Sequence, residues 1–181
     1  LYKKIENCEI HWIKQPTPMG FGHALLSAKK FVDEDFLLHA GDTYFPNYDF
    51  IPQLIKLSKK TQKSSCCLLL QSKKDLKGYG IAEIQKKNNT NIVFNVEEKP
   101  KLPKSNLAIL PVYTFRPSIF DALKHTTIGH NKELQVTDAI KTLINRNEKV
   151  VALKMIKQWF DIGTPHNYFK AMSYSYKQNK I

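Results

Sequence analysis

Two aspartates in this chain have the sequence surroundings of metal ligands. Asp42 follows the apolar run 36–40, Asp161 follows two aromatic residues, and each has a glycine within two positions. Carboxylates at the ends of two strands can share one Mg²⁺, a hard cation that keeps several waters and takes other ligands from a phosphate. Each aspartate alone is more typical of a turn, because aspartate and glycine both favour turns. The pair predicts a Mg²⁺ site where the fold brings the two strand ends together.

A second group of polar residues lies in the segment Val96-Glu-Glu-Lys-Pro100. The proline favours an extended Lys99, so Glu98 and Lys99 should point to opposite sides unless the strand bends. A lysine suits a phosphate as a flexible point charge, and a glutamate suits sugar hydroxyls as an acceptor. Taken alone, the segment is more typical of a solvated strand end.

Two glycine-bearing segments would let a ligand approach the main chain. In Gln15-Pro-Thr-Pro-Met-Gly-Phe-Gly22 the glycines open a predicted helix, and their missing side chains leave backbone amides accessible to a flat or anionic group. Tyr79-Gly80 has the same property, although alone it indicates only a loop. No serine or cysteine lies in a nucleophile elbow, so covalent catalysis has no support.

The composition argues against several classes of protein. The net charge is +12, but only Arg116 and Arg146 among the 28 basic residues are arginines. Nucleic-acid recognition favours the arginine fork, and the lysines are spread along the chain, so a nucleic-acid partner is disfavoured. The longest apolar run, 66–70, is too short to span a membrane. Three cysteines without metal-ligand spacing predict a reduced, cytoplasmic setting and disfavour zinc.

Alternating strand and helix patterns predict a Rossmann-like α/β fold with a mixed, mainly parallel sheet flanked by helices. Strands are expected at 10–13, 36–40, 65–71, 81–84, 92–96, 107–115, 150–156 and 159–161, and helices at 20–31, 50–60, 134–144 and 165–176. The two strands on either side of 86–90 should form a hairpin. The apolar run 65–71 predicts a strand covered on both faces, and Pro111 predicts an edge or a bulge.

Together these segments resemble the sugar-1-phosphate nucleotidyltransferase family, especially glucose-1-phosphate thymidylyl- and uridylyltransferases. The resemblance covers nearly the whole chain. Its six motifs, in the family's order, are Gln15-Pro-Thr-Pro-Met-Gly20, Gly41-Asp-Thr43, Tyr79-Gly80, Glu97-Glu-Lys-Pro100, Glu133-Leu-Gln-Val-Thr-Asp138 and Trp159-Phe-Asp-Ile-Gly-Thr164. Six motifs in one order carry far more weight than any one alone.

The resemblance implies a reaction and a role for each motif. The implied contacts are the pyrimidine base (Gln15, Gly20), Mg²⁺ (Asp42, Asp161), the sugar (Tyr79, Gly80, Glu98) and the sugar phosphate (Lys99). The sugar phosphate oxygen would attack the α-phosphorus of a nucleoside triphosphate, and pyrophosphate would leave. Asp42 and Lys99 would act by alignment and charge neutralisation. UTP and dTTP both stay open, because a glutamine reads an edge that uracil and thymine share; glucose 1-phosphate is the expected hexose.

The sequence departs from the family's pattern in three places. The family's Gly-x-Gly-Thr-Arg loop, which lies upstream of the glutamine–proline segment, is absent here; Pro111 stands where many relatives have glycine, and Asn131 stands at a position that is basic in some relatives. We therefore expect one domain over residues 1–181 that lacks the family's first βα unit and is inactive alone. The alternative is a non-catalytic regulatory or assembly subunit of the same fold, and a homo-oligomer stays open.

Overall fold

The computed structural model describes residues 6–61, 64–129 and 132–178, so Asn131 lies outside the described residues. The strands are β1 (Phe36–His39), β2 (Thr43–Tyr44), β3 (Ser64–Ser72), β4 (Gly80–Lys87), β5 (Thr90–Glu98), β6 (Leu107–Phe115), β7 (Lys149–Lys154) and β8 (Phe160–Asp161). The helices are α2 (Phe21–Ser27), the 3-10 helix η1 (Lys29–Phe31), α3 (Phe50–Lys60), α4 (Ser118–His125), α5 (Val136–Asn145) and α6 (Pro165–Gln178).

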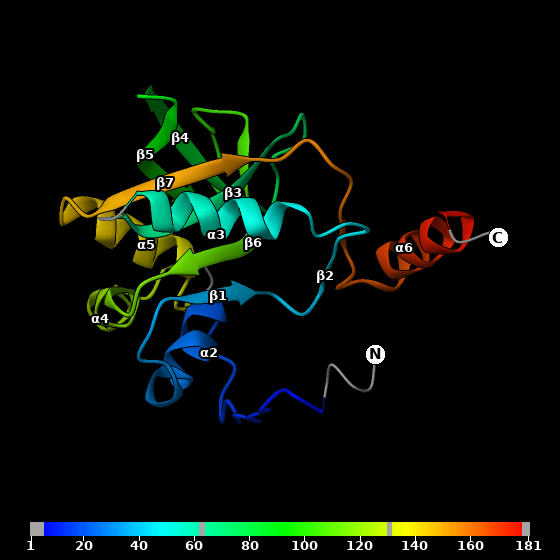
Figure 1. Cartoon of the computed structure of the whole chain (residues 1–181), viewed down its shortest axis with the longest axis horizontal. Coiled ribbons are helices and arrows are strands. Elements are labelled where there is room, and N and C mark those ends of the chain that lie inside the picture. The colour runs from blue at the N-terminus through cyan, green and yellow to red at the C-terminus, as the bar shows by residue number, and fades with distance from the viewer. Residues whose placement is uncertain (1–5, 62–63, 130–131, 179–181) are drawn as a thin grey trace.

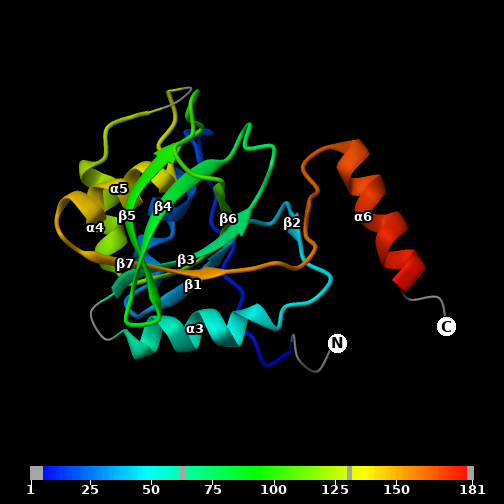
Figure 2. The same ribbon diagram turned by 90° about the horizontal axis from the view of Figure 1, so that it is seen from above.

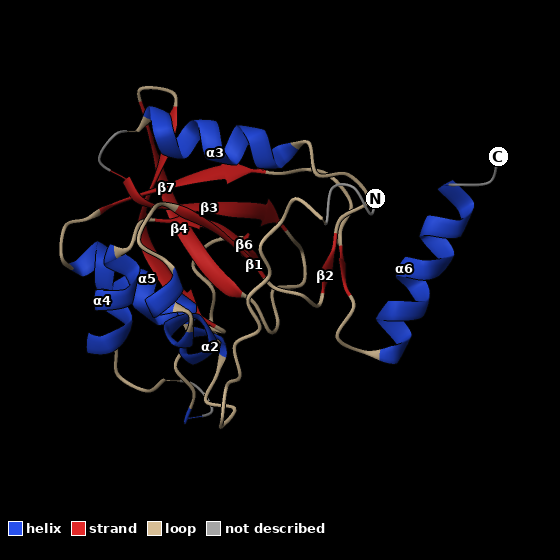
Figure 3. Ribbon diagram, turned by 60° about the horizontal axis from the view of Figure 1, so that its bottom comes forward, coloured by secondary structure: helices blue, strands red, loops and turns tan. Residues whose placement is uncertain are grey.

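A six-stranded sheet in the order β1-β6-β3-β7-β5-β4 forms the centre of the molecule (Figure 1). Helix α3 covers one face, and α4 and α5 cover the other (Figure 2), where α2 also lies (Figure 3). The predicted mixed α/β fold with flanking helices is confirmed. The expected mainly parallel order is wrong, because among the described strands only β3 and β7 pair in parallel.

The β4–β5 hairpin explains much of this antiparallel character. Its turn places Asn88 and Asn89 at φ 48° and 57°, the left-handed conformations that a two-residue hairpin turn requires. A tight turn can only join antiparallel strands, so β5 runs against β4, and it pairs against β7 as well. Strand β6 then lies between β1 and β3 and opposes both. The predicted hairpin is confirmed, but its effect on strand direction was not foreseen.

Strand β3 is the centre of two hydrophobic cores. Cys66, Leu68 and Leu70 pack into the cluster beneath α2, α4 and α5. Cys67 and Leu69 point the other way, into the cluster that includes residues of α3. All five side chains are at most 1% exposed. The prediction of a strand covered on both faces is confirmed.

The proline in β6 coincides with a bulge and not with an edge. The pairing of β3 with β6 shifts between Leu68 and Leu69, whose partners are Tyr113 and Leu110. Pro111 falls in the skipped pair, and its carbonyl accepts a hydrogen bond from the Ala40 amide at 3.0 Å. A residue without an N–H is therefore accommodated inside a central strand.

Two further parts of the fold differ from the sequence-based expectation. Residues 10–13 form no strand and pair with none of the described strands, and Trp12 is 94% exposed. Helix α4 was not predicted, although it begins directly after Pro117, a residue that suits a helix start.

Helix α6 stands apart from the body of the molecule (Figures 1 and 3). Its main neighbour is β8, the short strand that precedes it. Only Ala171 of this helix is buried. None of the described helices has the length and apolar content needed to cross a membrane.

Candidate active site

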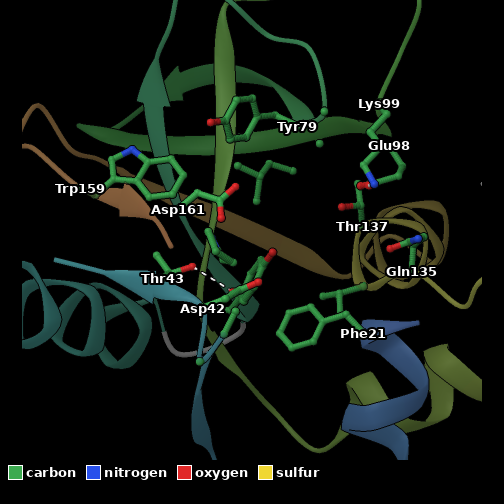
Figure 4. Close-up of a pocket in the computed structure, with 18 residues that line it drawn as sticks. Phe21, Asp42, Thr43, Tyr79, Glu98, Lys99, Gln135, Thr137, Trp159 and Asp161 are labelled. Carbon is green, nitrogen blue, oxygen red and sulfur yellow. Dashed lines mark hydrogen bonds and ion pairs between the residues drawn. The ribbon is translucent and has the colours of Figure 1, made fainter. Parts of the chain in front are cut away.

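A cavity of about 480 Å³ opens at one edge of the sheet, within the usual size range of small-molecule sites. Figure 4 shows Tyr79, Trp159 and Asp161 on one side of it and Glu98, Lys99 and Thr137 on another. The lining also includes Phe21, Gly41, Asp42, Thr43, Gly80, Pro111, Tyr113 and Gln135. Segments far apart in the chain therefore meet at one site.

The two aspartates come together through a small ladder of β2 and β8. Thr43 pairs with Asp161, and the amide of Ile162 donates to the carbonyl of Asp42 at 2.7 Å. A Cβ on Gly163 would lie 3.2 Å from Asp161 Oδ1 and 3.5 Å from Asp42 Oδ2. The absence of a side chain at Gly163 therefore leaves space between the two carboxylates.

This carboxylate pair fits a hard cation that is shared with a substrate. Mg²⁺ is commonly bound through one or two carboxylates, with waters and phosphate oxygens completing six ligands. Within the described residues no group of three or more histidine, cysteine, aspartate or glutamate side chains is arranged so that it could hold a metal ion by itself. The donor set of Asp42 and Asp161 thus suits a substrate-completed Mg²⁺ site better than a closed protein cage.

Glu98 and Lys99 face the same cavity because the chain bends between them. Lys99 has a φ of 43°, so the expected extended conformation is wrong. Its amide donates to the Tyr79 carbonyl at 3.2 Å, which ties the bend to the start of β4. Lys99 Nζ lies 3.5 Å from Glu98 Oε1. A left-handed non-glycine residue is strained, and such strain is common at functional sites.

Gly80 leaves room for two polar side chains of the cavity. An added Cβ would lie 2.8 Å from Thr137 Oγ1 and 3.1 Å from Glu98 Oε2. Thr137 is buried in the first turn of α5, where backbone amides lack partners within the helix. This corner of the cavity therefore offers a hydroxyl, a carboxylate and helix amides to a polar ligand.

Aromatic side chains form the opposite wall. The Tyr79 and Trp159 rings meet edge to face with centroids 6.1 Å apart, and Trp159 Nε1 donates to Gln71 Oε1 at 2.7 Å. Burial, with a smaller contribution from the charge of Glu98, raises the pKa of the Tyr113 phenol. Tyr113 therefore stays neutral and cannot act as a base at ordinary pH.

Gln15 and Gly20, the proposed base contacts, are not among the residues that line this cavity. Gln15 Nε2 lies 3.2 Å from the Gly20 carbonyl and 2.8 Å from His23 Nδ1. Gly20 has a φ of 97°, and an added Cβ would lie 2.8 Å from the Leu134 carbonyl. The glycine is thus required by packing, and its neighbour Phe21 is the residue that reaches the cavity.

Comparison with known proteins identifies the family. The family model described as nucleotidyl transferase matches residues 2–178. The chain belongs to the nucleotidyl transferase family. The resemblance to sugar-1-phosphate nucleotidyltransferases is confirmed at this level, and the fold agrees with it.

Individual relatives support the same assignment. The chain is 31% identical to a glucose-1-phosphate thymidylyltransferase of Streptomyces antibioticus, across 86% of this chain and 42% of that protein. It is 32% identical to a UTP–glucose-1-phosphate uridylyltransferase of Streptococcus pyogenes, across 89% of this chain and 56% of that protein. A solved UDP-glucose pyrophosphorylase complexed with UDP-glucose matches with a TM-score of 0.88 and 25% identity, across 98% of this chain and 70% of that one. The chain thus spans about half the length of these two curated relatives.

The sequence motifs included many of the residues that line this cavity, but they gave no role to Thr137, which lines it, or to Gln71 and Lys73, which contact its aromatic wall. Thr137 appeared only within the motif 133–138 and the expected helix 134–144, Gln71 only as the last residue of the expected strand 65–71, and Lys73 in no expected helix or strand. The position of Thr137 in the first helical turn was the available signal, because this is where unpaired amides gather. Nothing in the sequence links Gln71 or Lys73 to Trp159.

Proposed function

We propose that this chain forms part of an enzyme that transfers a nucleotidyl group from UTP or dTTP to a hexose 1-phosphate, with glucose 1-phosphate as the expected acceptor. The supporting observation is that one cavity is lined by the carboxylates of Asp42 and Asp161 and by the Glu98–Lys99 pair. Two acids suit a metal–triphosphate complex, and the pair suits a sugar that carries a phosphate.

Tyr79, Gly80 and Glu98 would hold the hexose. Glu98 can accept hydrogen bonds from sugar hydroxyls, and Gly80 leaves the main chain open to them. Lys99 would hold the phosphate, and its fixed bend keeps the ammonium on the same side as Glu98. The sugar and its phosphate would therefore be oriented by residues of one contiguous corner.

The reaction requires an oxygen of the sugar phosphate in line with the α-phosphorus of the triphosphate. The new bond forms between that oxygen and phosphorus while the bond to pyrophosphate breaks. Asp42 and Asp161 would hold Mg²⁺, which would neutralise charge on the triphosphate. Lys99 would orient the attacking phosphate, so the residues of this chain contribute alignment and charge rather than covalent chemistry.

Gln15 and Gly20 are the proposed base contacts. A glutamine amide donates and accepts at once, which matches N3–H and a neighbouring carbonyl of uracil or thymine. Gly20 directly precedes α2, whose Phe21 lines the cavity, and Gln15 lies five residues earlier, with its side-chain amide against the Gly20 carbonyl. The base would thus lie at the α2 end of the site and the sugar at the β4–β5 end.

The test measures pyrophosphate release from UTP or dTTP with glucose 1-phosphate. It uses this chain and a longer form with a Gly-x-Gly-Thr-Arg loop upstream of residue 1. We expect turnover by the longer form, reduced about 100-fold or more by Lys99→Gln, since a preorganised charge at the reacting phosphate is removed. Lys101→Gln, a lysine two positions away, is the matched control and should keep the parent rate.

Two outcomes would decide against the enzyme. Glucose 1-phosphate binding that survives Lys99→Gln would remove Lys99 from the sugar phosphate site. Substrate binding without turnover in the longer form would instead favour a non-catalytic subunit of the same fold.

A further inference from the structure

Lys73 lies just outside the cavity and contacts both rings of its aromatic wall, Tyr79 and Trp159. Its Nζ is 4.4 Å from the centre of the Tyr79 ring and 4.5 Å from that of the Trp159 ring. It also donates a hydrogen bond to the Tyr79 hydroxyl at 3.0 Å. One ammonium group therefore links two side chains that the backbone does not link.

The three side chains come from three separate segments. Lys73 directly follows β3, Tyr79 precedes β4, and Trp159 precedes β8. The Lys73 amide donates to the Asn106 carbonyl at 3.0 Å, so the lysine is presented from a hydrogen-bonded extension of β3. The cavity wall is thus anchored to the central strand through a side chain.

Gln71 supports the same wall from two residues earlier. Residues two apart in an extended chain face the same side. Gln71 Oε1 accepts from Trp159 Nε1 at 2.7 Å, and Gln71 Nε2 donates to the Lys157 carbonyl at 2.9 Å. The indole is therefore held at its edge by an amide, while its face lies against the ammonium of Lys73.

Tyr79 also connects Lys73 to Lys99, the residue proposed to hold the sugar phosphate. The carbonyl of Tyr79 accepts the Lys99 amide, so a shift of Tyr79 moves the anchor of the bend at Lys99. A cation over an aromatic face is attracted by the ring quadrupole, and the attraction strengthens as water is excluded. Half-buried Lys73 has two such contacts and a hydrogen bond, so its removal should loosen the Tyr79 ring and the face of Trp159, whose edge stays bound to Gln71.

We propose that Lys73 is a positioning residue that fixes the Tyr79–Trp159 wall and thereby sets the affinity and selectivity of the site for its hexose 1-phosphate. The proposal rests on the proposed function, because it assigns the sugar to this part of the cavity. Lys73 would act through the two rings and would not touch the substrate. The base contacts at Gln15 and Gly20 come from another segment and should be unaffected.

Trp159 provides a direct reporter for the test. The chain contains two tryptophans, and Trp12 is 94% exposed, so Trp12→Phe leaves Trp159 as the sole source of indole emission. In this parent background we compare Lys73→Met, Lys73→Arg and Lys74→Met. The first removes the charge at similar length, the second keeps a cation and donors, and the third is the matched control on an exposed neighbour.

We expect Lys73→Met to raise the Kd of glucose 1-phosphate about tenfold, the size of effect that paired cation–π contacts support. The Kd of UTP should stay within about twofold of the parent, as should both constants in Lys74→Met. Lys73→Arg should restore sugar phosphate binding. Lys73→Met should also increase acrylamide quenching of Trp159 in the ligand-free protein, at an unchanged far-ultraviolet spectrum.

An unchanged Kd for glucose 1-phosphate in Lys73→Met would overturn the proposal, and so would an equal loss of UTP affinity. A parent that binds no glucose 1-phosphate would overturn the proposed function instead. In that case quenching of Trp159 decides whether Lys73 positions the wall: greater quenching in Lys73→Met supports it, and unchanged quenching rejects it.

Discussion

The two sides of the cavity differ in how many strand pairs and buried contacts support them. Gly80 and Glu98 lie at the ends of β4 and β5, within a six-stranded sheet that has a hydrophobic core on each face. Asp42 and Asp161 depend on β2 and β8, which form a separate ladder of two residue pairs. We call these the sheet side and the ladder side.

We expect the sheet side to be the more rigid binding surface and the ladder side to be the more adjustable one. Local opening needs little free energy where few hydrogen bonds and buried contacts must break. The sheet side can therefore hold the orientation of a sugar phosphate, whereas the ladder side can shift its two carboxylates to fit a metal–triphosphate complex. Substitutions on the sheet side should be costly in stability, and substitutions on the ladder side should affect chiefly ligand binding.

The largest effect is expected from Gly80→Ala on the sheet side. The added Cβ would lie 2.8 Å from Thr137 Oγ1 and 3.1 Å from Glu98 Oε2, so both side chains must move. Overpacking of this kind should lower the free energy of unfolding by about 1–3 kcal/mol. The Kd of glucose 1-phosphate should rise about 100-fold, given about 1.4 kcal/mol for each factor of ten.

Urea unfolding and titration calorimetry measure the two effects. Gly41→Ala is the control for stability, because a Cβ there meets nothing within 4 Å, and it should unfold within about 0.5 kcal/mol of the parent. Equal stability of the Gly80 and Gly41 variants would contradict the tight packing of the sheet side.

On the ladder side, Asp42→Asn and Asp161→Asn should each weaken Mg²⁺-dependent UTP binding about 10- to 100-fold, because one of two anionic ligands is lost. Both aspartates are exposed, so the free energy of unfolding should change by less than about 0.5 kcal/mol. Residues that share one ion act as a unit, so the double variant should be little weaker than either single one. Additive losses in calorimetric titrations would mean that the two acids bind separately.

Gln15→Ala should leave both sides of the cavity unchanged and should weaken only the binding of the nucleotide base. We expect UTP and dTTP to bind about 1–3 kcal/mol more weakly, the cost of leaving buried partners without hydrogen bonds. Glucose 1-phosphate should bind as in the parent. Unchanged nucleotide affinity in titration calorimetry would reassign Gln15 to its observed local contacts with Gly20 and His23.

The smallest effect is expected on the pH dependence of the free energy of unfolding, through Cys67 in strand β3. Burial raises the pKa of the Cys67 thiol to about 12, above its ordinary value of 9.0. The folded protein then keeps a proton that the unfolded chain loses, so the free energy of unfolding is unaffected below about pH 9 and decreases as the pH rises toward 12.

Between pH 8 and pH 10, the parent should lose about 1 kcal/mol more than Cys67→Ala does. Urea unfolding at both pH values measures the difference, with Cys8→Ala as a control at an exposed cysteine. A parent and a Cys67→Ala variant with the same pH dependence would show that the thiol is not shielded as the structure indicates.

The sheet side was largely predictable from sequence because its signals are local. The apolar run 65–71 identified the central strand, the two apolar segments on either side of 86–90 predicted the hairpin, and Pro111 predicted an edge or a bulge, of which the structure has the bulge. Strand direction was less accessible, because alternating strands and helices suggested parallel pairing and the position of β6 depends on contacts distant in sequence.

Other features depend on tertiary contacts that no local pattern encodes. The bend at Lys99 is held by the carbonyl of Tyr79, so a rule about the residue before proline gave the wrong conformation. The apolar residues at 10–13 resembled a strand but have no partner in the described structure, which leaves Trp12 exposed. The meeting of Asp42 and Asp161 was predicted, because both acids follow strands, whereas the support of Trp159 by Lys73 was not.

The double coverage of β3 also bears on how the chain folds. A strand that is apolar on one face resists a one-residue slip, because the slip would expose its hydrophobic side chains. Cys66 to Leu70 are apolar on both faces, so a slipped β3 would still be buried and patterning alone would not reject it. The bulge at Leu68/Leu69 restricts this choice, because Pro111 has no N–H and fits only the skipped pair. The proline in β6 therefore adds a constraint on the register of β3 to the one that its parallel pairing with β7 supplies.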